Sequence, residues 1–246
     1  MRAYRETPPP PPLADWVECF WRRGAYSSAD EVEQRILPDG AADIIIDLER
    51  GDAFVVGTMT APLVLREREA PELLGIRFRP GRAAPFLRSP LAPLTDRRIA
   101  LRDLWGREAD SFAGAASSRS LETLIEQLVR IARDAETDRR VGAAIEAITR
   151  SGGALSIDVV CSTIGISRQH LARKFLAEVG VAPKTFARVV RFRRVIDRAS
   201  RSRGRGWAAL ASESGYFDQS HLIADFRRFA GLNPVPFFQS QEAAAL

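Results

Sequence analysis

The stretch from residue 165 to residue 183, GISRQHLARKFLAEVGVAP, recurs in altered form from residue 214 to residue 234 as SGYFDQSHLIADFRRFAGLNP. Five residues of the first stretch have an identical partner 51 positions later, in the same order. The pairs are His170 and His221, Leu171 and Leu222, Phe175 and Phe226, Gly180 and Gly231, and Pro183 and Pro234. Five matches in one register indicate an internal duplication, which includes both histidines of the chain.

The first copy predicts two helices joined by a tight turn. A cap at Ser156 can start one helix, which runs to about Thr163 and is ended by Gly165. Ser167 can cap a second helix over residues 168–179. The apolar residues of this helix repeat at helical spacing and must face the core: Leu171, Phe175 and Val179. Two helices around a short turn with a glycine form a helix-turn-helix, whose second helix enters the major groove of DNA.

The second copy repeats this pattern, with Gly215 after its first helix and Asp218 as the cap of its second. The residues expected to face inward are Trp207, Leu210, Ala211, Leu222, Phe226 and Phe229. Residues 200–206, SRSRGRG, precede this copy as an exposed basic loop, either beside phosphates or as a plain linker.

Between the two copies, Pro183 can begin a linker helix that reaches about Ala199. The apolar positions of this helix are Phe186, Val189, Val190, Phe192, Val195 and Ile196. A helix of some 17 residues is roughly 25 Å long. It can therefore hold two recognition helices near the roughly 34 Å that separates successive major-groove faces.

Charge is divided unevenly along the chain. Residues 137–246 contain 17 basic and 9 acidic side chains, a net charge of +8. Residues 1–136 contain 19 basic and 22 acidic side chains, a net charge of −3. A basic C-terminal domain indicates an anionic partner, although a solvated basic surface gives the same balance. The charged stretch 133–140 is expected to separate two domains, 1–136 and 137–246, which fits a length of 246 residues.

The first domain is expected to be mostly β, a small sheet or barrel followed by helices. Short apolar runs separated by turn residues occur at 32–37, 43–48, 53–56, 62–65 and 73–78. The second domain is expected to be all helical. The fold class predicted for the whole chain is therefore α+β, with the strands confined to the first domain.

Three features of the first domain allow more than one interpretation. Five prolines, Pro8–Pro12, predict an extended polyproline II segment, which is either a lead-in lying on its own domain or a ligand for a proline-reading domain. Arg77, Arg79 and Arg82 could form a cationic spot that holds an anion, or could be solvated residues at a sheet edge. Ser120 can cap a helix that serves either dimerisation or packing on its own sheet. The apolar stripe of that helix is Leu121, Leu124, Ile125, Leu128, Ile131 and Ala132.

Composition excludes several classes of protein. With 46% hydrophobic and 27% charged residues, the chain is not disordered. It has no run of about 18 uncharged apolar residues for a membrane span, and the N-terminal MRAYRETPPPPPL lacks the apolar segment of a secretory signal. Cys19 and Cys161 provide neither zinc spacing nor a disulfide framework, so we expect no metal, no cofactor and a cytoplasmic location.

An enzyme is not expected either. A repair protein that transfers alkyl groups, fused to a DNA-binding domain, would need an activated cysteine beside a histidine or zinc. Cys19 lies between bulky apolar residues, Cys161 lies in a predicted DNA-binding helix, and residues 1–136 contain no histidine. The sequence therefore offers no catalytic residue.

Residues 155–239 resemble the DNA-binding domain of the AraC/XylS family of bacterial transcription regulators. The resemblance rests on the two quoted stretches and on Arg191-Phe192 in the linker helix. The N-terminal part, with LPDG at 37–40 and GIRFRPG at 75–81, resembles a poorly characterised domain that often precedes this DNA-binding domain. The resemblance implies binding of double-stranded DNA by the C-terminal domain, and a sensory or dimerisation role for the N-terminal one.

The resemblance also implies which residues touch DNA. The base-reading positions of the family fall on Arg168, Gln169, Ala172 and Arg173 in the first unit, and on Gln219, Ser220, Ile223 and Ala224 in the second. Arginine suits guanine and glutamine suits adenine in the major groove. Contacts with phosphate, or positioning of the helices, are expected from Ser167, His170, Lys174, Asp218, His221, Arg227 and Arg228.

The second unit departs from the family pattern. Ala224 stands where an arginine is common, and Ile223 replaces a small polar residue. Neither side chain can form bidentate hydrogen bonds, although both can touch a thymine methyl group. The second unit is therefore expected to position the protein on the DNA backbone more than to read bases. In the linker helix, Val195 also stands where the family usually has alanine.

These observations predict a sequence-specific transcription regulator that a small molecule controls through the N-terminal domain. An activator is expected, while the sequence itself does not reveal whether transcription rises or falls. The alternative is a DNA-binding regulator without a ligand, controlled by its abundance or by a protein partner. RNA polymerase, a small-molecule effector and a second copy of the chain stay open as partners. If an effector binds, the N-terminal domain should hold an apolar-walled pocket. The candidate wall residues, each of which could equally be core, are Trp16, Phe20, Trp21, Phe54 and Phe78.

Overall fold

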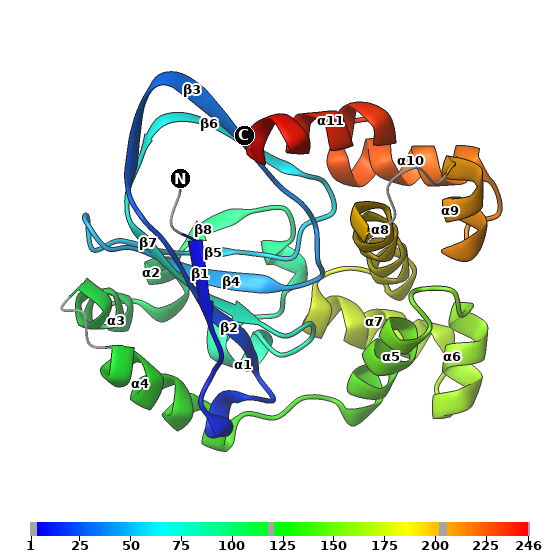
Figure 1. Ribbon diagram of the computed structural model, residues 1–246. Coiled ribbons are helices and arrows are strands. Elements are labelled where there is room, and N and C mark those ends of the chain that lie inside the picture. Colours follow the sequence, from blue (N-terminus) through cyan, green and yellow to red (C-terminus); the bar gives the residue numbers. More distant parts are fainter. Residues whose placement is uncertain (1–3, 118–120, 202–205, 246) are drawn as a thin grey trace.

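The structure is a computed structural model that describes residues 4–117, 121–201 and 206–245 (Figure 1). Its N-terminal part contains a six-stranded antiparallel sheet with the strand order β1-β2-β7-β4-β5-β8. These strands are Tyr4–Thr7 (β1), Val17–Arg23 (β2), Leu73–Phe78 (β7), Ala42–Asp47 (β4), Ala53–Val56 (β5) and Arg98–Ala100 (β8). The mostly β character expected of this part is confirmed.

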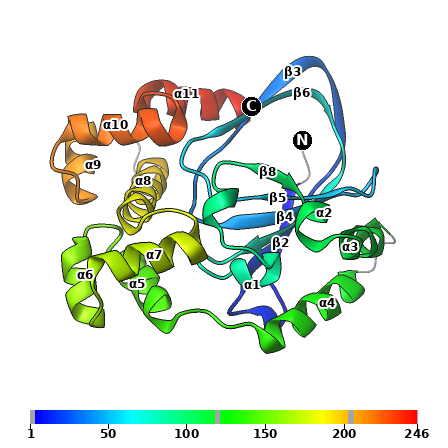
Figure 2. The ribbon, with the colours of Figure 1, turned by 180° about the vertical axis from the view of Figure 1, so that it is seen from behind.

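Two further strands form a separate two-stranded ribbon. They are β3 (Tyr26–Ile36) and β6 (Leu63–Ala70), which pair with each other in an antiparallel register. Figures 1 and 2 show this β3–β6 ribbon arching away from one side of the sheet, while helices cover the other side. Both strands are longer than the apolar runs that predicted them. Arg66, Glu67 and Glu69 continue the pairing along β6, and on β3 it resumes at Ser27 and Tyr26 beyond an irregularity in the register.

Three strands, β1, β2 and the three-residue β8, were not predicted from the sequence. The side chains of β1 are all exposed, so no alternation marks this edge strand. β2 is buried at all but two positions, so its sequence VECFWRR shows no regular alternation of apolar and polar residues.

The polyproline interpretation of Pro8–Pro12 is wrong in its second half. Pro10 has polyproline-like dihedrals, φ −65° and ψ 158°, but Pro11–Leu13 is a 3-10 helix that buries Leu13 in the core.

Four helices pack with the sheet: α1 (Ala84–Leu87), α2 (Leu101–Trp105), α3 (Glu108–Ser117) and α4 (Leu121–Asp134). Leu124 and Leu128 of α4 are fully buried in the same hydrophobic core as Ile44 and Phe78. The stripe on α4 therefore packs on its own domain and does not form a free dimerisation face. The predicted cap of this helix, Ser120, lies outside the described residues.

The C-terminal part is helical. Its elements are α5 (Arg139–Arg150), α6 (Ile157–Ile164), α7 (Arg168–Val179), α8 (Pro183–Arg201), α9 (Trp207–Glu213), α10 (Gln219–Ala230) and α11 (Pro234–Ala245). The α+β class is thus confirmed, with the helices of the second half arranged as two helix-turn-helix units, α6–α7 and α9–α10, around the linker helix α8 (Figure 1).

The predicted caps and ends of these helices are present. Ser156, Ser167 and Asp218 each accept a hydrogen bond from the backbone N–H three residues later. Gly165 follows α6 with φ 67°, a left-handed conformation that favours glycine. Most of the basic loop predicted at 200–206 lies outside the described residues, and Ser200 and Arg201 belong to the last turn of α8.

Each helix-turn-helix unit has its own hydrophobic core, and α8 contributes to both. Phe186 and Ala187 pack with the first unit, whose buried residues include Leu171 and Phe175. Val189, Phe192 and Val195 pack with the second unit, whose buried residues include Leu222, Phe226 and Phe229. The 19 residues of α8 give a rod of about 28 Å between the two units.

Candidate DNA-binding surface

The second helix of the first unit, α7, divides cleanly into two faces. Leu171, Phe175 and Val179 are buried, whereas Gln169 and Arg173 are exposed on the opposite side. The helix therefore presents two of the predicted base-reading side chains to solvent. Ala172 lies between these faces and is half-buried.

Arg168 is placed differently from Gln169 and Arg173. Its guanidinium forms a two-pronged ion pair with the carboxylate of Asp158 on α6. Both side chains are exposed, so this pair is screened by water and exchanges readily with other partners. In the free protein, Arg168 thus braces the two helices of the first unit.

Three of the residues expected to contact phosphate or to position the first unit also have partners within the protein. The Ser167 hydroxyl accepts a hydrogen bond from the backbone N–H of His170 at 3.2 Å. Lys174 lies 3.5 Å from the carboxylate of Asp138, the N-cap of α5. The backbone N–H of Arg140, together with Lys174, lowers the pKa of Asp138. Of these contacts, the pair of Lys174 and Asp138 links α7 to the start of α5.

The second unit has the same construction but a different surface. Gln219, Ser220 and Ala224 are exposed on α10, and Ile223 is half-buried against the core of the unit. The backbone N–H of His221 donates to the Asp218 carboxylate at 2.7 Å, and the His221 ring lies 5.2 Å from that of Tyr216. The exposed face of α10 thus offers few hydrogen-bond donors at its centre.

A buried ion pair joins the second unit to the linker helix. Asp225 is completely buried, and its carboxylate accepts hydrogen bonds from Arg188 of α8 at 2.6 and 3.0 Å. Removing one partner of such a pair leaves an uncompensated buried charge, so the contact fixes α10 on α8. Sequence reasoning missed this pair, because its members lie 37 positions apart in two different helices.

The two arginines expected to touch phosphate lie near the C-terminal end of α10. Arg227 donates to the side-chain oxygen of Asn233 at 2.8 Å. Arg228 donates to the hydroxyl of Thr60 at 3.5 Å, across the boundary to the N-terminal part. Both side chains are exposed and available to an anion.

The N-terminal part contacts the C-terminal ends of both recognition helices. Carbonyls in the last turn of a helix have no partner within the helix. On α7, the hydroxyl of Thr58 donates to the Val179 carbonyl at 2.6 Å, and the hydroxyl of Thr95 donates to that of Gly180 at 2.7 Å. On α10, Arg35 of β3 donates to the Ala230 carbonyl at 2.8 Å.

The LPDG turn at 37–40 also contacts the C-terminal part, through the linker helix α8. Gly40 has φ +85°, and a β-carbon at this position would lie 2.5 Å from the ring of Phe186 on α8. Only glycine combines this backbone conformation with so close an approach. The LPDG turn therefore packs directly against the linker helix, a role that was not predicted from the sequence.

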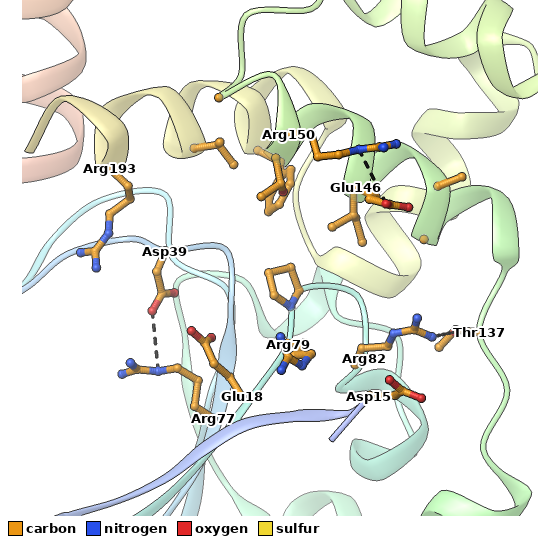
Figure 3. A pocket seen from close by; sticks show the side chains of 18 of the residues that line it. Asp15, Glu18, Asp39, Arg77, Arg79, Arg82, Thr137, Glu146, Arg150 and Arg193 are labelled. Carbon is orange, nitrogen blue, oxygen red and sulfur yellow. Dashed lines mark hydrogen bonds and ion pairs between the residues drawn. The ribbon is translucent and has the colours of Figure 1, made fainter. Parts of the chain in front are cut away.

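A cleft of about 1400 Å³ lies between the sheet and helices α5 and α8 (Figure 3). Arg77, Arg79 and Arg82 all line it, but each has protein partners. Arg77 lies 3.5 Å from Asp43 and 3.7 Å from Asp39, and Arg79 donates to the Ala14 carbonyl at 2.7 Å. Arg82 donates to Thr137 and lies over the ring of Trp16. All three arginines thus have partners within the protein, which neither interpretation of the sequence predicted.

A smaller cavity of about 230 Å³ lies beside β1, β2 and α4. It is mostly apolar, with Phe20, Trp21, Leu48 and Leu74 among its lining residues. Arg5 and Arg22 also line it, and the guanidinium of Arg22 pairs with Glu72 at 2.6 Å. Of the candidate wall residues, Phe20 and Trp21 line this cavity. Phe78 is instead fully buried in the core, and neither Trp16 nor Phe54 lines the cavity.

Neither cysteine lies in the environment of an activated nucleophile. Burial raises the pKa of the Cys19 thiol to about 11 and also raises that of Cys161, the opposite of an activated nucleophile. Within the described ranges, no three His, Cys, Asp or Glu side chains gather in a way that could hold a metal ion. Among these residues there is also no helix long and apolar enough to cross a membrane.

Comparisons with known proteins agree with this architecture. A helix-turn-helix domain family matches residues 160–240, and a domain of unknown function (DUF6597) matches residues 5–100. No curated protein matches the chain. Solved structures of ToxT from Vibrio cholerae are similar at low identity. An apo variant is 11% identical and covers 89% of this chain and 96% of its own, with a TM-score of 0.44.

The wild-type ToxT structure with a bound unsaturated fatty acid is 13% identical, with coverages of 89% and 94% and a TM-score of 0.44. The two family matches confirm the resemblance drawn from the sequence. The chain therefore joins an N-terminal DUF6597 domain to a C-terminal helix-turn-helix domain of the AraC type.

Proposed function

We propose that the protein is a sequence-specific transcription regulator in which residues 137–246 bind double-stranded DNA and residues 1–136 control that binding. The observation that carries the proposal is the pair of helix-turn-helix units on one linker helix. Each has an exposed face on its second helix, at Gln169 and Arg173 and at Gln219 and Ser220. The net charge of +8 in residues 137–246 supports a polyanionic partner.

Selection of bound sequences from random double-stranded DNA by the full chain tests this proposal. The enriched sequences should contain two elements separated by about 10 base pairs, because the two units would enter successive major-groove faces. A Gln169→Ala, Arg173→Ala double variant should lose the preference in one element and keep it in the other. No enrichment over unselected DNA would overturn the proposal.

The proposal includes control by a small molecule, for which the apolar cavity beside β1 and β2 is the candidate site. Its volume of about 230 Å³ suits a small, mostly apolar molecule, and Arg5, which also lines it, could pair with an anionic group on that molecule. The hydrogen bonds from Thr58, Thr95 and Arg35 to α7 and α10 offer a route by which a change in the β domain reaches both recognition helices.

A thermal-shift screen of small apolar acids tests the ligand site. A compound that binds there should raise the melting temperature of the wild-type chain. It should not do so for Leu74→Trp, which fills the cavity. An equal shift in both proteins would place the ligand elsewhere. If the whole screen gives no shift, control by abundance or by a protein partner is favoured instead.

The direction of regulation stays a prediction. Activation through contacts with RNA polymerase can be tested with a reporter gene fused to the selected operator in cells with and without the protein. Higher expression in cells that contain the protein is the expected result, and lower expression would identify a repressor. Sedimentation of the complex with one operator would show whether one or two copies bind.

A further inference from the structure

Phe217 is an anomaly on the surface of the second unit. Its side chain is 94% exposed, whereas the other exposed large hydrophobic side chains of the described residues expose between 38% and 50%. Leaving a phenylalanine ring in water forgoes the gain from burial that such a side chain normally provides. Contact of Phe217 with a partner molecule outside the folded chain would explain this exposure.

The cause is the length of the turn. In the first unit, one residue, Ile166, lies between Gly165 and the N-cap of α7, and it packs against the core of that unit. In the second unit, two residues, Tyr216 and Phe217, lie between the glycine and the N-cap of α10. The turn of the second unit is thus longer by one residue.

Tyr216 takes the inward place in the longer turn. It is 5% exposed, and its ring lies against His221 and beneath the guanidinium of Arg191. The core of the second unit is complete without Phe217, which is left at the start of α10, directly before the cap Asp218. Packing within the protein therefore gives no reason for a phenylalanine at this position.

Phe217 lies at the end of α10 that is free. The other end of the helix is held by the N-terminal part, since Arg35 donates to the Ala230 carbonyl and Arg228 donates to Thr60. The N-terminal end of α10, beside α9, points away from the β domain (Figure 1). Phe217 therefore shares the accessible side of the molecule with Gln219 and Ser220.

The same helix lacks a polar group at its centre. Ala224 is exposed one turn beyond Ser220, and Ile223 beside it is half-buried. A surface with an exposed phenylalanine and alanine can recognise one apolar mark in the major groove, the C5-methyl group of thymine. Exposed arginines farther along α10, Arg227 and Arg228, match the surrounding phosphates in charge.

We propose that Phe217, together with Ala224, reads thymine methyl groups in the part of the operator bound by the second unit. This inference rests on the proposed function and gives its second unit a chemical specificity. The unit selects thymine by apolar contact, where the first unit uses the hydrogen-bonding groups of Gln169 and Arg173.

Replacement of thymine by deoxyuridine tests the inference, because uracil keeps the base pair and lacks the methyl group. The full chain is titrated with its selected operator and with the same operator carrying deoxyuridine only in the second element. The wild-type protein should lose about fourfold in affinity for each contacted methyl group. Deoxyuridine in the first element serves as the control, and there wild type and Phe217→Ala should respond alike.

The variants assign the effect to the residue. Phe217→Ala should bind the thymine operator more weakly and should discriminate less between the two second-element operators, keeping only the part that Ala224 contributes. Phe217→Leu should discriminate more than Phe217→Ala, since it keeps a larger apolar side chain. Val235→Ala removes another exposed apolar side chain of the same domain and should discriminate like the wild type. Because Phe217 contacts solvent, its replacement should leave the circular dichroism spectrum and melting temperature unchanged.

Two results would overturn this inference alone: equal wild-type affinity for thymine and uracil in the second element, or undiminished discrimination by Phe217→Ala. Normal DNA binding by Phe217→Ala with lost reporter expression would assign the ring to a protein partner and would also overturn it. If the full chain selects no DNA sequence, the proposed function falls and this inference falls with it.

Discussion

At the scale of single residues, Arg173 and Ala224 occupy equivalent positions in the two units, 51 residues apart, and both are exposed. Arg173 can donate two hydrogen bonds to guanine, whereas the methyl group of Ala224 has none to offer. Arg173→Ala should weaken binding to the selected operator by about 1–3 kcal/mol and relax the preference at one position. Titration against operators that vary at each position measures both effects.

Arg227→Ala is the matched control for that change. A phosphate contact carries no sequence information, so this variant should weaken binding to all sequences alike and reduce the salt slope by about one unit. The titration against operators varied at each position should show stronger base preferences in the first element than in the second. A sharper preference under the second unit would contradict the assignment of Arg173 as the principal reader.

A second prediction at this scale concerns Asp43 in the sheet. Burial raises the pKa of its carboxyl from 3.8 to about 6, although Arg77 acts in the opposite direction. Between these two values the folded protein holds a proton that the unfolded chain has released. The free energy of unfolding should therefore fall as the pH rises through this window, by up to about 3 kcal/mol.

Denaturant unfolding of wild type and Asp43→Asn at several pH values measures this contribution. Asparagine keeps an oxygen that can accept the hydrogen bond which Trp21 donates to Asp43 at 2.7 Å, and it does not titrate. The difference in stability between the two proteins should change between about pH 4 and pH 6 and be constant above pH 7. A constant difference over the whole range would show that Asp43 does not titrate in this way.

At the scale of the elements, the packing of α8 against the LPDG turn depends on the absence of a side chain at Gly40. Gly40→Ala would force a left-handed alanine and place a β-carbon 2.5 Å from the Phe186 ring. Gly165→Ala is the matched control, because Gly165 is also left-handed, with φ 67° and ψ 44°, and has nothing within 4 Å of the added carbon. Gly40→Ala should lower the melting temperature more than Gly165→Ala does. Equal losses would mean that backbone strain alone is measured.

At the scale of the whole molecule, hydrogen bonds from Thr58 and Thr95 hold the C-terminal end of α7 on the N-terminal part. The double change Thr58→Val, Thr95→Val keeps the shape of both side chains and removes both donors. It should cost about 1 kcal/mol for each bond lost, or more where the carbonyl stays buried. Amide hydrogen exchange at the end of α7 should become faster, because the contact with the β domain then opens more often.

Thr163→Val controls for the loss of a threonine hydroxyl as such. Thr163 is exposed on α6 and donates to the Val159 carbonyl within its own helix, far from the domain contact. If amide exchange at the end of α7 becomes faster to the same extent in the double variant and in Thr163→Val, the hydroxyls of Thr58 and Thr95 do not link the two parts. If the link is real, the double variant should also bind the operator with a weaker dependence on any effector found in the thermal-shift screen.

The sequence alone determined the two helix-turn-helix units and the linker helix between them, whereas α5 and α11 were not predicted. Caps at Ser156, Ser167 and Asp218, the turn at Gly165 and the apolar spacing along α8 are local signals, because each involves residues within a few positions of one another. The duplication at an offset of 51 then identified two units of one kind. The exposure of Gln169 and Arg173 followed from the burial of Leu171 and Phe175 on the other side of α7.

Tertiary structure decided what depends on distant partners. Strand β2 pairs with β7 some 50 positions later, and Thr58 bonds a carbonyl 121 positions away, so no local pattern could indicate either contact. The stripe on α4 suited a partner chain or its own sheet equally well, and the enclosed core settled the choice. Phe217 was exposed because Tyr216 filled the one inward place of a turn, a competition for space that only the packed structure resolves.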